Sequence, residues 1–216
     1  MIVTIDGPAG AGKSTAARAL AQRLGFEFLD TGAMYRAVTW AGLKQGINLE
    51  DTEAVAEMAR CLDIQFDGSR VLVDGVDATS DLRSPRVTVE SRHVAGNLEV
   101  RRHLVTLQQR FGEGRNIVTE GRDQGTVVFP KAECKFYVTA DPRERAARRQ
   151  REFADRGQAV SLDELLAHQS ERDERDAGRD FGGMKPAPDA ATIDTTGLSH
   201  DEVVDLLERH TRSRMH

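Results

Sequence analysis

The feature that most constrains the fold of this chain is the segment IDGPAGAGKST at residues 5–15. Gly7, Gly12, Lys13 and Ser14 fit the pattern G-x-x-x-x-G-K-[ST], which joins the end of a strand to the start of a helix. The apolar run IVTID precedes this loop, and the helix-forming run KSTAARALAQRL includes and follows its end. The sequence therefore predicts a phosphate-binding turn at the carboxyl end of a β-strand.

Each part of such a loop has a chemical role. Backbone N–H groups of the loop and of the helix N-terminus point toward the anion. Lys13 reaches the terminal phosphates of a nucleotide, and the hydroxyl of Ser14 is placed to approach Mg²⁺. We expect the phosphates to be bound by Gly7, Pro8, Ala9, Gly10, Ala11, Gly12, Lys13, Ser14 and Thr15.

The loop alone leaves the class of protein open, because switch GTPases, motor ATPases and small-molecule kinases all carry one. The chain has no N-K-x-D guanine signature, and its 216 residues are too few for a motor or recombinase scaffold. The small size and the arginine-rich runs in the last third favour a kinase that closes a lid over two phosphorylated substrates.

Composition narrows the class further. The net charge is −5, with 39% hydrophobic and 30% charged residues, so one sizeable core is expected and a nucleic-acid partner is not. Cys61 and Cys134 match no metal or disulfide spacing. No signal sequence and no run of 18 apolar residues is present, so we expect a cytoplasmic protein without a membrane partner.

Apolar runs alternate with helical periodicity along most of the chain, which predicts an α/β fold with a five-stranded parallel sheet flanked by helices. A small antiparallel β meander is expected as an insert at about residues 63–79, where Asp67-Gly68 and Asp74-Gly75 signal tight turns. The predicted parallel strands are Ile2–Asp6, Phe26–Asp30, Ile117–Glu120, Lys135–Ala140 and Ala191–Asp194, and helices are expected at Pro85–Ala95, at Glu99–Phe111 and after the capping box of Ser199 and Glu202.

Charged residues follow two of these strands. Arg122 and Asp123 stand in EGRDQGTVVFP, on the same sheet edge as the loop, although a surface ion pair closing a turn would also explain them. In DTGAMYRAV, Thr31 is predicted as a helix N-cap, which needs no further function. Arg36 in the first turns of that helix makes an anion site an equal alternative.

The segment ERDERDAGR places Arg172, Asp176 and Arg179 at i, i+4 and i+7, which predicts one helical face. An ordinary i,i+4 salt bridge between Arg172 and Asp176 is the alternative. Gly178 is expected to end the helix beside Arg179.

The segments TIDGPAGAGKST, DTGAMYR, EGRDQGTVVFP and ERDERD together resemble bacterial cytidylate kinases, and the resemblance covers nearly the whole chain. It implies the nucleoside-monophosphate-kinase fold and transfer of the γ-phosphoryl group of ATP to CMP or dCMP, with Mg²⁺ at Ser14. It further implies one kinase domain over 1–216, an acceptor-binding region at 31–111 and a short lid at 148–160.

The resemblance also implies roles for individual residues. Arg36 and Arg122 hold the monophosphate; Thr31, Arg101 and Asp123 lie around the cytosine. The ribose, base or phosphate side of the acceptor is bound by Arg172, Asp176 and Arg179. The expected catalytic cations are Lys13, Arg122, Arg172, Arg179 and the lid arginines Arg148 and Arg149.

Three positions depart from the family pattern. Thr31 stands where serine is common, and Gln124 where methionine is common; a family serine near the base aligns with Arg92 rather than Ser91.

Two alternatives to a cytidylate kinase remain open from the sequence. One is a kinase of UMP or dTMP, and the other is a switch protein that hydrolyses ATP slowly. We expect a monomer.

Overall fold

The computed structural model describes residues 1–68, 70–155 and 157–215. The chain divides into two compact units. The first unit contains Met1–Leu29 and Gly112–His216, and the second contains Asp30–Phe111.

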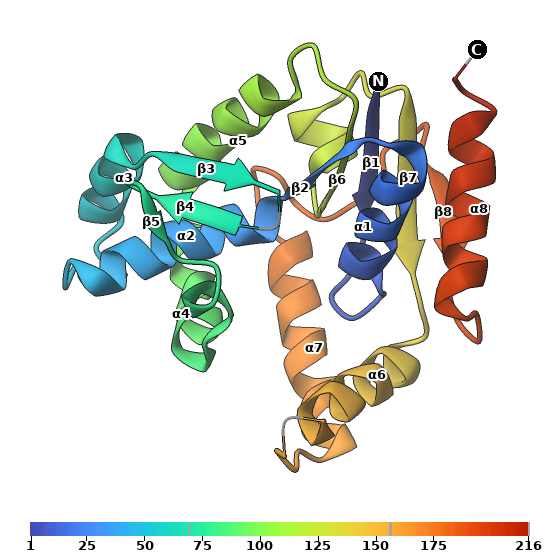
Figure 1. Ribbon diagram of the computed structural model, residues 1–216. Helices are drawn as coiled ribbons and strands as arrows, with labels where there is room; N and C mark the ends of the chain where they lie inside the picture. The colour runs from blue at the N-terminus through green and yellow to red at the C-terminus, as the bar shows by residue number, and fades with distance from the viewer. Residues whose placement is uncertain (69, 156, 216) are drawn as a thin grey trace. The chain divides into compact units, whose positions relative to one another are not determined.

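The first unit is built on a parallel sheet in the order β2-β6-β1-β7-β8 (Figure 1). Val3 of β1 lies opposite Val118 of β6 on one side and Cys134 of β7 on the other. The predicted five-stranded sheet is confirmed, with small shifts at the strand ends. The strands are β1 (Ile2–Asp6), β2 (Glu27–Asp30), β6 (Ile117–Gly121), β7 (Cys134–Thr139) and β8 (Ala191–Asp194).

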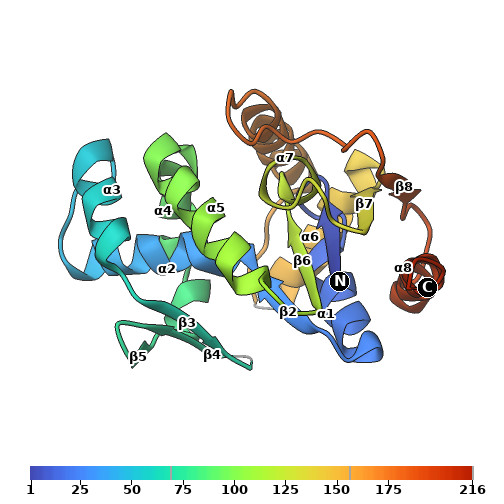
Figure 2. The same ribbon diagram turned by 90° about the horizontal axis from the view of Figure 1, so that it is seen from above.

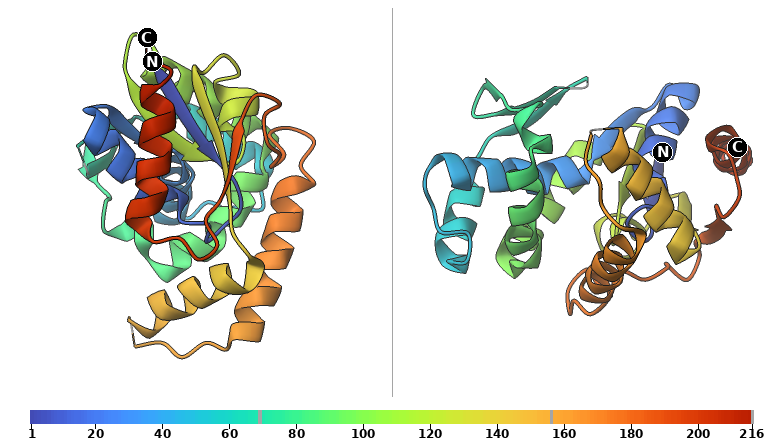
Figure 3. Two further views of the ribbon diagram at one scale, coloured as in Figure 1. Left: turned by 90° about the vertical axis from the view of Figure 1, so that its right-hand side faces the viewer. Right: turned by 90° about the horizontal axis from the view of Figure 1, so that it is seen from below.

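One face of this sheet is covered by α1 (Lys13–Leu24) and α8 (His200–Arg212). Alternate strand residues point to this face, as the two-residue period of a strand requires. The start of β1 and the end of α8 lie at the same end of the unit (Figure 3). The shared core includes Val3, Ile5, Leu20, Val118, Phe136, Val138, Val204 and Leu207.

Helices α6 (Pro142–Ala154) and α7 (Leu162–Ala177) follow β7 and pack against each other as a hairpin (Figure 1). Asp141 caps α6 by accepting hydrogen bonds from the first-turn N–H groups, and a capping box of Ser161 and Glu164 begins α7. The helix ends at Gly178, as predicted. The expected lid, 148–160, spans the end of α6 and the following turn, and residue 156 in it lies outside the described residues.

The second unit combines helices with a small antiparallel sheet in the order β3-β4-β5 (Figure 2). Asp74 and Gly75 both have positive φ, so the predicted Asp-Gly turn joins β4 to β5 and the predicted meander is confirmed. The elements are α2 (Thr31–Lys44), α3 (Thr52–Cys61), β3 (Ile64–Asp67), β4 (Arg70–Val73), β5 (Val76–Asp77), the 3₁₀ turn η1 (Asp81–Arg83), α4 (Pro85–Gly96) and α5 (Leu98–Gly112).

The predicted N-cap of α2 is wrong. Asp30 caps the helix, because its Oδ1 accepts a hydrogen bond of 2.8 Å from the N–H of Ala33. Thr31 is the first residue of the helix and is buried. The carboxylate of Asp30 occupies the capping position, so the hydroxyl of Thr31 is not required for it.

No helix within the described ranges is both long and apolar enough to cross a bilayer.

The tight turn after β1 generates a stability prediction. Gly7 has a φ of 138°, and a Cβ built there would overlap the backbone carbonyl oxygen of Val138. We expect Gly7→Ala to lower the free energy of unfolding by ~3 kcal/mol or more, because backbone of β7 has to move. Chemical denaturation followed by circular dichroism measures this change.

Gly25→Ala is the matched control. Gly25 caps α1 with a φ of 68°, but nothing lies within 4 Å of its added Cβ. Only the left-handed backbone cost of ~1–2 kcal/mol applies there. If both variants lose the same free energy of unfolding, glycine is needed at position 7 only for its backbone conformation, and the close contact with β7 adds nothing.

Candidate active site

The phosphate loop lies between β1 and α1, where Gly12 takes a left-handed conformation and its carbonyl accepts the first hydrogen bond of α1. Lys13 is buried, and its Nζ donates a hydrogen bond of 2.7 Å to the carbonyl of Pro8. Burial first, and then the charge of Arg122, lower the pKa of Lys13 to about 7. The amine is therefore held inside the loop, where burial disfavours its charged form and the carboxylates of Glu120 and Asp6 offset this only in part.

Beside Lys13, the Ser14 hydroxyl donates a hydrogen bond of 2.8 Å to Oε1 of Glu120. Glu120 is buried in β6, the strand next to β1. A hydroxyl and a carboxylate are hard oxygen donors and fit Mg²⁺, which keeps several waters and binds one or two carboxylates plus substrate phosphates. Within the described chain, no group of three or more His, Cys, Asp or Glu side chains forms a dedicated metal cage.

Sequence reasoning missed Glu120. Its only signal was an acidic residue at the end of an apolar run, and the strand order was needed to bring that run beside β1.

Three arginines surround the buried carboxylate of Asp176. Arg179 and Arg122 donate to it at 2.6 and 2.8 Å, and Arg172 lies 3.9 Å away and is more exposed. Burial alone would raise the pKa of Asp176, but the three guanidinium groups outweigh it and hold the pKa below its usual value. The cluster has more positive than negative charge, which suits an anionic ligand.

The predicted arrangement of this cluster is partly wrong. Arg179 lies beyond the last residue of α7, so it does not share a helical face with Arg172 and Asp176. It pairs with Asp176, three residues earlier, from the turn that follows α7. Arg122 pairs with Asp176, 54 residues away.

Arg122 and Asp123 lie between β6 and a π-helical turn, η2 (Gln124–Val128), which sequence reasoning did not predict. The carboxylate of Asp6, at the end of β1, accepts hydrogen bonds of 2.8 and 2.7 Å from the N–H groups of Gln124 and Gly125. Burial raises the pKa of Asp6 to about 6. Asp6 thereby fixes the segment that follows Arg122 and the buried Asp123, a role that the sequence pattern did not reveal.

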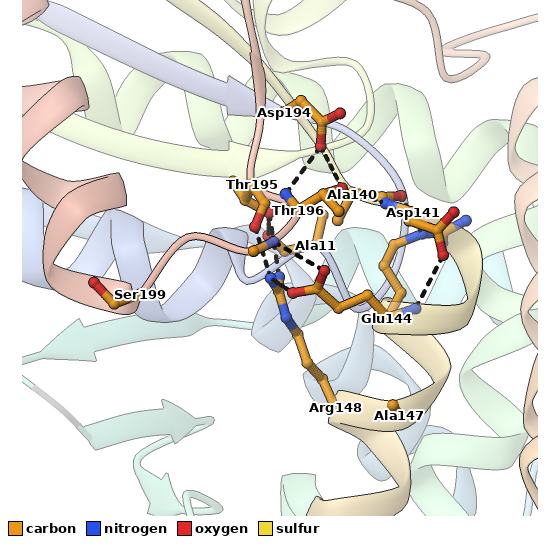
Figure 4. Close-up of polar contacts among 12 residues, drawn as sticks. Ala11, Ala140, Asp141, Glu144, Ala147, Arg148, Asp194, Thr195, Thr196 and Ser199 are labelled. Carbon is orange, nitrogen blue, oxygen red and sulfur yellow. Dashed lines mark hydrogen bonds and ion pairs between the residues drawn. The ribbon is translucent and has the colours of Figure 1, made fainter.

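The two predicted lid arginines differ in their surroundings. Figure 4 shows Arg148 donating to Thr195, with 2.8 Å to its carbonyl and 3.2 Å to its hydroxyl, and pairing with Glu144. The hydroxyl of Thr195 also reaches the carbonyl of Ala11 in the phosphate loop, at 3.4 Å. Arg149 is more exposed and pairs with Glu152 at 2.6 Å. Arg148 is thus tied to the turn after β8.

The remaining predicted residues belong to the second unit. Arg36 lies 3.4 Å from Asp30, and its buried Nε has no hydrogen-bond partner within the described residues. Arg101 is buried, donates to the carbonyl of Ala95 at 3.3 Å and lies 5.7 Å from the ring centroid of Tyr35. Thr31, Arg36 and Tyr35 share the start of α2, so this unit gathers two cations and a hydroxyl around one helix N-terminus.

Ser91 and Arg92, the two residues beside the position of the family serine, lie on α4. The hydroxyl of Ser91 donates to the carbonyl of Thr88, and Nε of Arg92 contacts His93.

Known proteins resemble this chain over nearly its whole length. A family model described as cytidylate kinase matches residues 3–213. A protein from Rhodopirellula baltica named cytidylate kinase is 49% identical over 98% of this chain and 93% of its own length. Another of the same name, from Caldanaerobacter subterraneus subsp. tengcongensis, is 46% identical over 94% of this chain and 91% of its own length.

The fold has counterparts among solved structures. The crystal structure of shikimate kinase from Bacteroides thetaiotaomicron superposes with a TM-score of 0.50 and 15% identity, covering 98% of both chains. At this identity the similarity concerns the fold alone. The match to the family model over nearly the whole length and the two close relatives identify the chain as a member of the cytidylate kinase family.

Proposed function

We propose that this protein transfers the γ-phosphoryl group of ATP to CMP or dCMP, giving ADP and CDP or dCDP. The observation that carries the proposal is the arginine cluster around Asp176, in the same unit as the phosphate loop. A hydrolytic switch needs one phosphate site, whereas a kinase needs a second site for the acceptor anion. Family membership supports cytidine nucleotides as acceptors.

The chemistry requires positioning and charge neutralisation, because two anionic nucleotides must bring their reacting oxygens into line. The ammonium of Lys13 would leave the carbonyl of Pro8 and bind the β- and γ-phosphates. Arg122, Arg172 and Arg179 would exchange part of their interaction with Asp176 for the acceptor phosphate. No covalent intermediate with the enzyme is needed.

Mg²⁺ would be held through Ser14 and Glu120, and when bound it neutralises charge on the donor phosphates. Thr31, Arg101 and Asp123 are proposed for the base, Arg36 for the acceptor phosphate, and Arg148 and Arg149 for the donor side. The phosphate loop and the arginine cluster come from one chain, which supports a monomer, and the net charge of −5 favours small-molecule substrates over nucleic acid. We also propose a cytoplasmic location.

The decisive experiment measures ADP formation from ATP with CMP, dCMP, UMP or dTMP as acceptor, and identifies the products by chromatography. We expect stoichiometric conversion of CMP or dCMP to the diphosphate. A preference for UMP or dTMP would refute the proposed acceptor, and phosphate release indifferent to any acceptor would indicate a switch ATPase.

Replacing Lys13 should separate activity from stability. Lys13→Met should lower turnover by ~10²–10³-fold or more, because it removes a charge aimed at the transferred group. The variant should nevertheless melt at a higher temperature than the wild type at pH 7, because a desolvated ammonium is lost. Steady-state kinetics and calorimetry measure the two effects, with the exposed Lys131→Met as control.

The stability difference should depend on pH. The pKa of Lys13 falls from 10.5 in the unfolded chain to about 7 in the fold. Between these values the unfolded chain holds more protons, so the contribution of Lys13 to the free energy of unfolding rises with pH. The advantage of Lys13→Met should be full below pH 7 and shrink toward pH 10. A constant difference over this range would contradict the burial of a charged amine.

Glu120→Gln tests the proposed metal ligand. The amide keeps the size of the side chain and can still accept from Ser14, but it binds Mg²⁺ more weakly than a carboxylate. We expect the Mg²⁺ concentration for half-maximal activity to rise ~10- to 100-fold. An unchanged Mg²⁺ dependence, matching that of the exposed control Glu113→Gln, would remove Glu120 from the metal site.

Asp123→Asn tests recognition of the base. A carboxylate accepts a hydrogen bond from the exocyclic amino group of cytosine but would face a carbonyl oxygen of uracil. An amide can donate instead, so the variant should lose efficiency with CMP, and the preference for CMP over UMP should fall by ~5- to 150-fold. The ratio of kcat/KM for CMP to that for UMP reports this change. A wild-type ratio would exclude Asp123 as the base-reading residue, and exposed Asp180→Asn is the control.

A further inference from the structure

The phosphate loop is attached to the α6–α7 hairpin at Ala9. The N–H of Ala9 donates to Oδ1 of Asp173 on α7, at 3.2 Å. The carbonyl of Ala9 accepts from Nη1 of Arg145 on α6, at 2.8 Å. Arg145 and Asp173 also bond to each other, at 2.6 Å between Nη1 and Oδ2. Both polar groups of one loop residue are therefore held by a single ion pair.

This ion pair is largely shielded from solvent, with Arg145 buried and Asp173 partly buried. The side chain of Arg145 is 8% exposed and that of Asp173 is 17% exposed. Nε of Arg145 donates in addition to the carbonyl of Ala140, at the start of the connection to α6. An ion pair that is desolvated and bonded on several sides holds its groups in one geometry, and removal of one partner leaves an uncompensated charge.

The attachment controls the peptide group that Lys13 uses. The Pro8–Ala9 peptide accepts from Nζ of Lys13 through its carbonyl and donates to Asp173 through its N–H. A peptide group is planar, so fixing its N–H also fixes the direction of its carbonyl. The next peptide is held through its carbonyl by Arg145. The hairpin thus orients two successive peptides of the loop and, through the first, the ammonium of Lys13.

Packing beside Ala9 is equally close. A Cβ built on Gly10 would lie 3.2 Å from Cβ of Arg145 and 3.4 Å from Nε2 of Gln169. The amide of Gln169 is buried, and within the described residues it has no hydrogen-bond partner. Gln169 fills space against the loop, whereas Arg145 and Asp173 supply its polar attachment.

We propose that Arg145 and Asp173 are positioning residues for the phosphate donor. They set the conformation of the loop at Ala9 and thereby the place from which Lys13 meets the donor phosphates. They touch no reacting atom in this role. The proposal rests on the proposed function only for its kinetic test, since binding of ATP by the loop can be measured without an acceptor.

The test compares Asp173→Asn with the wild type. Asparagine has the same shape and can still accept from Ala9, but it loses the charge that pairs with Arg145. Glu174→Gln is the matched control, because it makes the same change one residue along α7 on an exposed side chain. Calorimetric titration with a non-hydrolysable ATP analogue measures donor binding, and steady-state kinetics give the KM values for ATP and CMP separately.

We expect Asp173→Asn to weaken binding of the ATP analogue and to raise KM for ATP by ~10-fold or more, with KM for CMP changed less than ~2-fold. Arg145→Met should act in the same way, and Arg145→Lys, which keeps the charge, should recover part of the affinity. The double variant Asp173→Asn and Arg145→Met should lose less affinity for the ATP analogue than the two single variants lose together, because it leaves no unpaired charge.

Wild-type binding of the analogue by Asp173→Asn and Arg145→Met would overturn the proposal, as would equal rises in the two KM values. Additive losses in the double variant would also overturn it. If thermal melting shows that Arg145→Met does not fold, the test uses Arg145→Lys and Asp173→Asn instead. A wild-type protein that does not phosphorylate CMP refutes the proposed function, and the binding titrations still decide the role of Arg145 and Asp173.

Discussion

Buried positive charge at the carboxyl ends of β1 and β6 is the constraint on which the rest of the first unit depends. A site for two phosphates needs several cations in a small, partly desolvated space, and without ligands those cations repel one another. The structure relieves this repulsion by pairing each cation with an oxygen acceptor, which two of the arginines share. Lys13 uses the carbonyl of Pro8, Arg122 and Arg179 use Asp176, and Arg145 uses Asp173.

These acceptors keep the cations in place and leave them available for exchange. A phosphate oxygen offers a stronger and more highly charged acceptor than a carbonyl, and a dianion can bind guanidinium groups that share one carboxylate. Lys13 shows the cost of the arrangement, because burial lowers the pKa of its amine to about 7. A charge that is unfavourable in the free protein becomes favourable when an anion arrives, which is how a binding site differs from a stable core.

The hairpin of α6 and α7 links these charges. Arg145 and Arg148 lie on α6, while Arg172, Asp173 and Asp176 lie on α7. Because Asp173 holds the loop and Asp176 holds the arginine cluster, one turn of α7 serves both the proposed donor side and the proposed acceptor side. A rigid helix that carries both contacts fixes their separation, and in-line phosphoryl transfer requires such a fixed separation.

Local rules in the sequence determined the strands, the phosphate loop, the Asp-Gly turn of the meander, the end of α7 at Gly178 and the family. Each depends on residues that are neighbours in the chain, such as glycines that permit positive φ or apolar residues at a fixed period. The roles of Glu120, Asp6, Arg145 and Asp173 depended on the tertiary structure, because each acts on a partner far away in the chain. Asp30 rather than Thr31 caps α2, because β2 ends at Asp30 and its carboxylate accepts from the N–H of Ala33. Composition and spacing identify the side chains that can bind phosphate. Which acceptor each charged side chain pairs with depends on the strand order and the helix packing, because electrostatic and hydrogen-bond energies depend on distance and burial.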